Sequence, residues 1–275
     1  MRHTWVVFER NGARVVLTTL AGYSLIARDL PRSLDNVAAK PQVSRETEYY
    51  LGHIEDVKSV DDFLADRRLF GYAMKAFGLG DLTYAKALMR KVLVEGVDKP
   101  DSLANTLTDQ RYREFAEAFN FARYAETTTI FDRTRQGTVD RYVRQTLEED
   151  AGAQNEGVRL ALYFARKAPE ITSHYGILGD IALLKVVQTT LGISPATAAL
   201  NIDKQAEMFA KRLDIDDLKD PDKVANLLNR FASLWDLSQG NSASGSPGLL
   251  FAQPLELGIG GDLLASLQNL KLGGP

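Results

Sequence analysis

The sequence contains an internal repeat that restricts the fold more than any other feature. Residues 49–79 align with residues 163–193 without a gap, each residue i matching residue i + 114. Six of the aligned pairs are identical: Tyr49/Tyr163, Ser59/Ser173, Leu64/Leu178, Asp66/Asp180, Leu69/Leu183 and Gly78/Gly192. Four more keep an apolar or aromatic residue in both segments: Tyr50/Phe164, Val57/Ile171, Phe63/Ile177 and Leu79/Ile193. Two copies of a unit of roughly 75–85 residues do not make a solenoid, which stacks shorter and more numerous repeats. We therefore predict a duplicated multi-helix unit that forms two pseudo-equivalent lobes around one core.

The alignment resumes downstream after small insertions. Two further pairs of segments match: residues 98–105 with 219–226, and residues 115–119 with 231–235. The repeat copies therefore lie at about residues 43–126 and 157–237, inside a helical body that spans residues 18–237.

Each copy contains the start and stop signals of a helix. Ser59 followed by Asp62 has the spacing of a capping box, and apolar residues at helical spacing then continue to Gly78. We expect each copy to form a helix pair whose second helix begins at Ser59 or Ser173 and ends at Gly78 or Gly192.

Helical spacing extends over most of the remaining chain. Further helix starts are predicted at Thr83, Asp109, Thr138 and Asn155, residue types that cap helices well. No convincing strand alternation occurs after residue 19. The predicted fold class is all-α.

Residues 1–17 form an N-terminal extension that differs from this body. The apolar runs 5–8 and 15–17 flank Asn11-Gly12, a dipeptide typical of a type I′ turn, so a small β-hairpin is one interpretation. The other interpretation is a translation start near Val15–Leu17 at a non-Met codon. The residues leave both open.

Residues 238–275 are predicted to be a flexible linker and a short amphipathic tail. Residues 238–248 are rich in Ser and Gly, the composition of a flexible linker. Asp262 can then cap a helix with an apolar stripe formed by Leu263, Leu264, Leu267 and Leu270. So short a helix does not persist alone, so we expect it to dock on its own body or in the groove of a protein partner. These leucines are the predicted partner-binding residues.

Composition excludes several classes of protein. The chain has 33 Lys and Arg against 36 Asp and Glu, a net charge of −3, without a basic patch, so no nucleic-acid partner is expected. The absence of cysteine excludes disulfides, Fe–S clusters and a thiol nucleophile. The first apolar run is too short for a secretory signal, and residues 237–255 contain too much Ser, Gly and Pro to span a bilayer. We expect no membrane insertion, and either a cytoplasmic location or export without a Sec signal.

No constellation of catalytic or metal-binding residues is evident. The histidines stand apart from one another and from paired carboxylates: His3, His53 and His174. Residues 78–81 contain two glycines but lack the Lys-Ser/Thr of a phosphate-binding loop. Asp66 and Asp180 recur in both copies, so we expect each to pair with a helix end or an arginine. No catalytic residue, cofactor-binding residue, metal ligand or cofactor is predicted.

Several segments carry a family resemblance: residues 24–30, 46–51, 57–64, 72–79, 89–93, 115–121 and 154–164. The motifs include Glu46-Thr-Glu-Tyr-Tyr-Leu51 and Gln154-Asn-Glu-Gly-Val-Arg-Leu-Ala-Leu-Tyr-Phe164. Over about residues 18–237 the chain resembles an α-proteobacterial family described as a domain of unknown function. The resemblance implies a unit often present in more than one copy and genes that often lie among flagellar genes. It implies no catalytic residues.

These observations favour a non-enzymatic helical interaction protein that takes part in flagellar assembly or its regulation. One alternative is an enzyme with an unrecognised site between the lobes, at which Asp66, Arg159 or His174 would converge. Another is an exported flagellar component, which would need long terminal coiled-coil helices that this sequence lacks.

Overall fold

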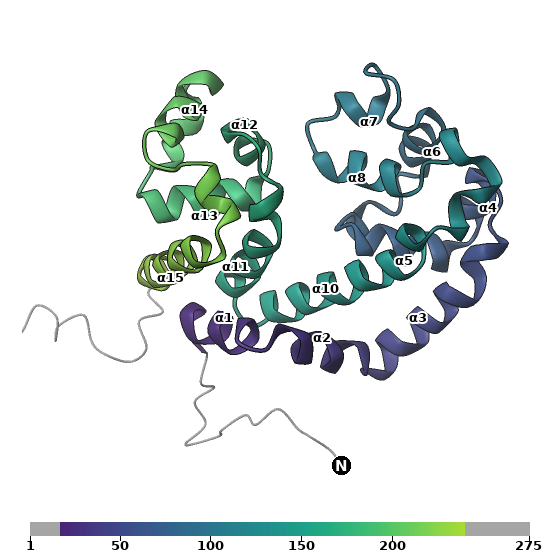
Figure 1. Cartoon of the computed structure of the whole chain (residues 1–275), viewed down its shortest axis with the longest axis horizontal. Helices are drawn as coiled ribbons and strands as arrows, with labels where there is room; N and C mark the ends of the chain where they lie inside the picture. Colours follow the sequence, from purple (N-terminus) through teal and green to yellow (C-terminus); the bar gives the residue numbers. More distant parts are fainter. Residues whose placement is uncertain (1–16, 240–275) are drawn as a thin grey trace, which may run out of the picture.

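The structure is a computed structural model that describes residues 17–239. Every regular element within these residues is a helix, which confirms the predicted all-α class. The expected N-terminal hairpin falls almost wholly outside the described residues, as do the tail and nearly all of the linker before it. Figure 1 shows two lobes side by side, joined below by α1, α2 and α10.

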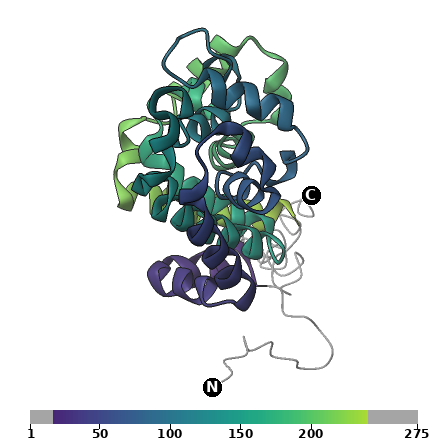
Figure 2. The ribbon, with the colours of Figure 1, turned by 90° about the vertical axis from the view of Figure 1, so that its right-hand side faces the viewer.

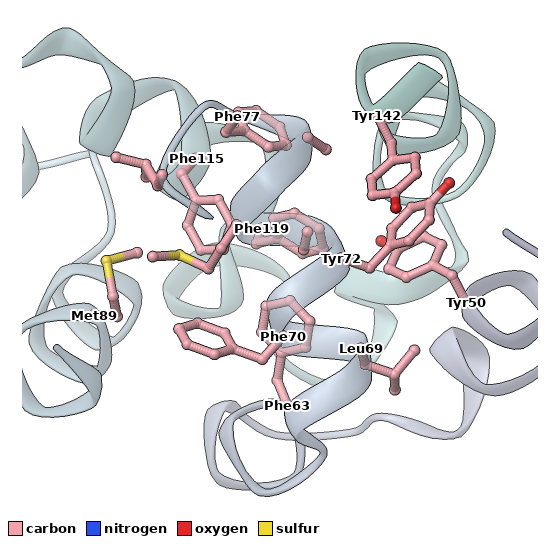
Figure 3. Close-up of a cluster of buried hydrophobic side chains, with 14 of the residues drawn as sticks. Tyr50, Phe63, Leu69, Phe70, Tyr72, Phe77, Met89, Phe115, Phe119 and Tyr142 are labelled. Carbon is pink, nitrogen blue, oxygen red and sulfur yellow. The ribbon is translucent and has the colours of Figure 1, made fainter. Parts of the chain in front are cut away.

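The first lobe consists of α2 to α9 and most of α10. Its elements are α2 (Leu30–Ala38), α3 (Pro41–His53), η1 (Ile54–Asp56), α4 (Val60–Ala65), α5 (Arg67–Ala76), η2 (Gly80–Leu82), α6 (Lys86–Glu95), α7 (Leu103–Thr106), α8 (Gln110–Ala118), α9 (Phe121–Tyr124), η3 (Ala125–Ile130), η4 (Asp132–Thr134) and α10 (Gln136–Gly152). Aromatic side chains fill its core, with Phe63 of α4, Phe70 of α5 and Phe77 directly after α5 facing Phe115 and Phe119 around α8 (Figure 3).

The second lobe consists of α1 and the helices after α10. Its elements are α1 (Thr19–Ala27), α11 (Glu156–Lys167), η5 (Ala168–Glu170), α12 (His174–Leu178), α13 (Ile181–Leu191), η6 (Pro195–Ala199), α14 (Ile202–Ala210), η7 (Asp216–Lys219) and α15 (Pro221–Ser238). Thr19 ties α1 to this lobe, because its backbone N–H donates to Asp236 Oδ1 of α15 at 3.0 Å. Seen from the side, α1 and α2 lie at one end of the molecule (Figure 2).

The buried side chains form two hydrophobic clusters, one in each lobe. The prediction of one core shared by the lobes is therefore wrong. The physical reason lies at the α10–α11 junction, where Glu148 is 2% exposed and accepts hydrogen bonds from Arg144 and Arg166. A buried carboxylate bonded to two guanidinium groups makes this junction polar, so the buried apolar side chains on its two sides form separate clusters.

The helix predicted from Ser59 to Gly78 is two helices. Ser59 caps α4 as expected, but the chain breaks at Asp66, whose carboxylate accepts from the N–H groups of Arg68 and Leu69 and starts α5. The second copy breaks in the same way at Asp180, between α12 and α13. An aspartate whose side chain bonds the N–H groups that follow it competes with helix continuation, which apolar periodicity does not reveal.

Helix ends and the other predicted starts give a mixed outcome. Gly78 and Gly192 end their helices at φ values of +70° and +64°, as predicted. Asp109 and Asn155 are N-caps, as predicted. Two other predicted starts are wrong, because α6 begins at Lys86 without a side-chain cap and α10 begins at Gln136. Thr83 lies in the turn before α6, and Thr138 is buried inside the first turn of α10.

Candidate functional site

The structure does not bring together the residues considered for an inter-lobe active site. Asp66 caps α5, and Arg159 pairs with Glu156 one turn earlier on α11. His174 lies at the start of α12 and bonds through Nε2 to the carbonyl of Leu213 at 2.9 Å. Each of these side chains therefore has a structural partner of its own.

Asp66 and Asp180 make matching contacts in the two lobes. The Tyr49 hydroxyl donates to Asp66 Oδ2 at 2.8 Å, and the Tyr163 hydroxyl donates to Asp180 Oδ2 at 2.6 Å. With their N-cap bonds, both carboxylates are paired with helix ends, as predicted.

The first lobe has a hollow in its described surface, which we call the arginine hollow. It has a volume of about 550 Å³ and lies between the turn after α6, α8, α9, η4 and the start of α10. Its lining residues are Val97, Asp98, Glu114, Glu117, Ala118, Asn120, Arg123, Tyr124, Arg133, Gly137 and Arg141. This volume lies in the range of sites that hold small molecules or a peptide side chain.

Arg133 is held rigidly at the wall of the arginine hollow. Its guanidinium packs against the rings of Tyr124 and Phe131, with Cζ 4.5 Å from each ring centroid, and the two rings contact each other edge to face at 4.9 Å. Nε donates to the carbonyl of Ala118 at 3.1 Å, but the buried Nη2 has no hydrogen-bond partner within residues 17–239. A buried guanidinium N–H without an acceptor is unfavourable, so this group is poised for a hydrogen-bond acceptor.

Fully buried threonines fix the backbone that carries Arg133. Thr138 Oγ1 donates to the carbonyl of Arg133 itself at 3.1 Å, and Thr134 Oγ1 donates to the carbonyl of Thr128 at 3.0 Å. Thr128 Oγ1 in turn donates to the carbonyl of Ala125 at 2.8 Å. Thr138 was predicted to cap a helix, but in the structure its hydroxyl holds the backbone of Arg133 instead.

Tyr124, the ring that covers Arg133 on one side, stands next to a strained residue. Ala125 has φ +46° and ψ −125°, and it is the non-glycine residue with positive φ among those described. Such a conformation costs about 1–3 kcal/mol and persists only where surrounding contacts enforce it. The neighbouring Arg123 and Arg133 guanidinium groups lower the pKa of the Tyr124 phenol.

The other two arginines of the hollow already have carboxylate partners. Arg123 Nε donates to Asp98 Oδ2 at 2.9 Å, and this pairing lowers the pKa of Asp98 and raises that of Arg123. Arg141 Nη1 lies 3.7 Å from Glu114 Oε2, and Glu114 also accepts from Lys167 of α11. Glu114 therefore links the hollow to the second lobe.

The lining residues provide several kinds of group for recognition. They include guanidinium, carboxylate, amide and phenol groups, and no histidine, serine, threonine or lysine. No group of three or more His, Asp or Glu side chains within residues 17–239 could hold a metal ion. In the same part of the chain, no helix has both the length and the apolar character needed to cross a bilayer.

Sequence reasoning did not find the arginine hollow. Its charged residues come from five separate elements, so no spacing in the sequence joins them. The sequence signal nearest to it was a dense run of Thr between residues 127 and 138, which is unusual in a helical protein. The predicted partner-binding residues Leu263, Leu264, Leu267 and Leu270 lie outside the described residues.

Comparison with known proteins identifies the family. Residues 76–224, more than half of the chain, match a family described as protein of unknown function (DUF1217). A search of curated proteins gave no match. The chain is similar to the X-ray crystal structure of protein AGR_C_984 from Agrobacterium tumefaciens, a structural genomics target. The identity is 45%, the TM-score is 0.75, and the match covers 84% of this chain and 99% of that chain. The chain therefore belongs to the DUF1217 family.

Proposed function

We propose that this protein is a non-enzymatic interaction protein that binds a protein partner through the arginine hollow. The observation that carries the proposal is the chemistry of the hollow: a guanidinium packed against two aromatic rings, with a buried nitrogen that lacks an acceptor within the described residues. Groups held in place by packing and hydrogen bonds favour specific binding, because little freedom is lost when a ligand arrives.

We further propose that the partner belongs to flagellar assembly or its regulation. The support for this context is the resemblance of residues 18–237 to a family whose genes often lie among flagellar genes, and it rests on analogy. The predicted internal duplication fits the same proposal, because members of that family often carry more than one copy of the unit.

The proposal is tested by affinity purification from motile cells. Tagged wild-type protein and an Arg133→Lys variant are compared by quantitative mass spectrometry, with Arg212→Lys as the matched control. Arg212 is an exposed arginine of the second lobe that also donates to a helix-end carbonyl, that of Leu191. We expect flagellar proteins to be enriched with the wild type and the control and depleted with Arg133→Lys.

A deletion strain provides the second arm of this test. We expect it to lose motility and to regain it with the wild-type gene. Normal motility of the deletion strain, together with no flagellar protein in the purification, would exclude the flagellar context. Recovery of the same partners with Arg133→Lys would exclude the arginine hollow as the binding site.

A further inference from the structure

We infer that the arginine hollow binds a carboxylate group presented by a peptide, with Arg133 as the residue that holds it. This inference deepens the proposed function, on which it rests for the partner being a protein. It is supported by the state of each charged group that lines the hollow.

Arg133 is the arginine of the hollow that keeps unused hydrogen-bonding capacity. Arg123 is committed to Asp98, and Arg141 lies beside Glu114. In the Arg133 guanidinium, Nε donates to the carbonyl of Ala118, whereas the buried Nη2, which carries two N–H groups, has no partner within the described residues. Because the remaining N–H groups form a planar fork, they match the two oxygens of a carboxylate.

The contacts of Arg133 also fix the direction of this fork. The guanidinium packs against the touching rings of Tyr124 and Phe131, and the hydrogen bond from Nε to the carbonyl of Ala118 sets its rotation. Nη2 is covered in the structure, so we expect the Tyr124 ring to shift when a carboxylate reaches it. The strained backbone at Ala125 directly follows Tyr124 in the chain.

The charges around the hollow favour a carboxylate over a phosphate. Asp98, Glu114 and Glu117 also line it, and together they balance the charges of the three arginines. A phosphate dianion would meet three carboxylates in addition to one available guanidinium, whereas a carboxylate brings a single negative charge. The hollow is also large enough to accept a side chain or a chain end with its neighbouring peptide group.

The test uses two small probes, one with a side-chain carboxylate and one with a chain-terminal carboxylate. The full chain is labelled with ¹⁵N-arginine and titrated at constant ionic strength, and the Nε–H signals are followed by NMR. N-acetylglutamate α-amide presents only a side-chain carboxylate, and N-acetylalanine presents only a terminal carboxylate. N-acetylglutamine α-amide and inorganic phosphate serve as the neutral and the phosphate comparison.

We expect saturable shifts of the Arg133 signal with at least one carboxylate probe, and the better probe tells whether the hollow takes a side chain or a chain end. The neutral probe should give no shift at Arg133, and phosphate should bind at least about tenfold more weakly than the better carboxylate.

Two variants complete the test. In Arg133→Lys, binding of the better carboxylate, followed through the Arg123 and Arg141 signals, should weaken about tenfold because the fork is lost while the charge stays. Arg212→Lys should bind as the wild type does. No saturable shift with either carboxylate, an equal or stronger response to phosphate, or undiminished binding by Arg133→Lys would overturn the inference. Because this titration uses no cellular partner, its result is independent of whether the partner is flagellar.

Discussion

In the first lobe Tyr49 donates to Asp66 and Ser59 caps α4, and in the second lobe Tyr163 donates to Asp180 and Ser173 caps α12. The helix boundaries match as well. At an offset of 114 residues, η1 coincides with η5, and the ends of α4 and α5 agree with those of α12 and α13 to within one residue. The stops match as well, because the N–H groups of Leu79 and Ile193 each bond to the carbonyl five residues earlier. These contacts support the proposed duplication.

The two lobes share these helix boundaries but differ in the side chains that fill their cores. Where α4 and α5 carry Phe63, Phe70 and Phe77, the second copy carries aliphatic residues, Ile177, Leu184 and Leu191. Phe63 packs against Phe70 and Phe119 at centroid distances of 5.9 and 4.9 Å, contacts that an aliphatic core cannot reproduce. The comparison indicates that the two lobes share helix caps and stops, whereas the side chains that fill their cores differ.

The largest expected effect comes from the cores. Phe63→Ala should lower the free energy of unfolding by about 4 kcal/mol and Ile177→Ala by about 3 kcal/mol, because the larger side chain leaves the larger cavity. Both residues are fully buried. Urea unfolding followed by circular dichroism measures the two losses, with Ile181→Ala, at a residue 83% exposed, as the control. A greater loss for Ile177→Ala would contradict this order.

The next effect concerns the polar junction between the lobes. Glu148→Gln keeps the shape of the side chain but leaves Arg144 and Arg166 without the carboxylate that they share. Breaking such a buried ionic cluster should cost about 3 kcal/mol.

The neighbouring residue provides the control for this prediction. Glu149 also bonds a cation, Lys75, but its side chain is 44% exposed, so Glu149→Gln should change stability little. Equal stabilities of the two variants by thermal unfolding would show that the junction contributes nothing to joining the lobes.

Many of the helix starts and stops, but not the candidate site, could be predicted from the sequence. N-caps such as Ser59 and Asp109 and the stop at Gly78 act through a few adjacent residues, so local patterns identify them. The break at Asp66 depends on whether one side chain bonds its own backbone, which periodicity does not report. The arginine hollow depends on contacts between distant elements, such as Arg133 with Ala118 and Tyr124, and no local pattern encodes these.

A smaller effect separates the two tyrosine–aspartate bonds. Burial raises the pKa of Tyr163 far above its usual range, whereas the pKa of Tyr49 is raised chiefly by its hydrogen bond to Asp66. Tyr163→Phe should therefore cost about 1.5 kcal/mol, because it removes the donor to Asp180 Oδ2 in a less hydrated place. Tyr49→Phe should cost less. A larger loss for Tyr49→Phe in urea unfolding would contradict this order.

The first of these bonds should also respond to acid. Burial tends to raise the pKa of Asp66, but the hydrogen bonds from Leu69, Tyr49 and Arg68 outweigh it and hold the pKa below its usual value. The stability contributed by Asp66 is present above the unfolded-state pKa of about 3.9 and is lost as the pH falls through the lower folded-state pKa. Tyr49→Phe moves that folded-state pKa upward, so it should reduce the loss of Tm between neutral and acid pH relative to the wild type.

The smallest effect tests the caps that the two copies share. Ser59→Ala and Ser173→Ala should each cost about 1 kcal/mol, because each leaves an N–H of the first helical turn without its acceptor. The copies differ three residues later, where the first has Asp62 and the second has Gly176. The hydrogen bond with Ser59 and that from the Lys58 N–H lower the pKa of Asp62, so its contribution is present above about pH 4 and is lost in acid. Thermal unfolding at neutral and acid pH should therefore show that Ser59→Ala costs less at acid pH, whereas Ser173→Ala costs the same at both. A cost of Ser59→Ala that does not change with pH would mean that Asp62 adds nothing to the cap and that the two helix starts are equivalent in energy as well as in geometry.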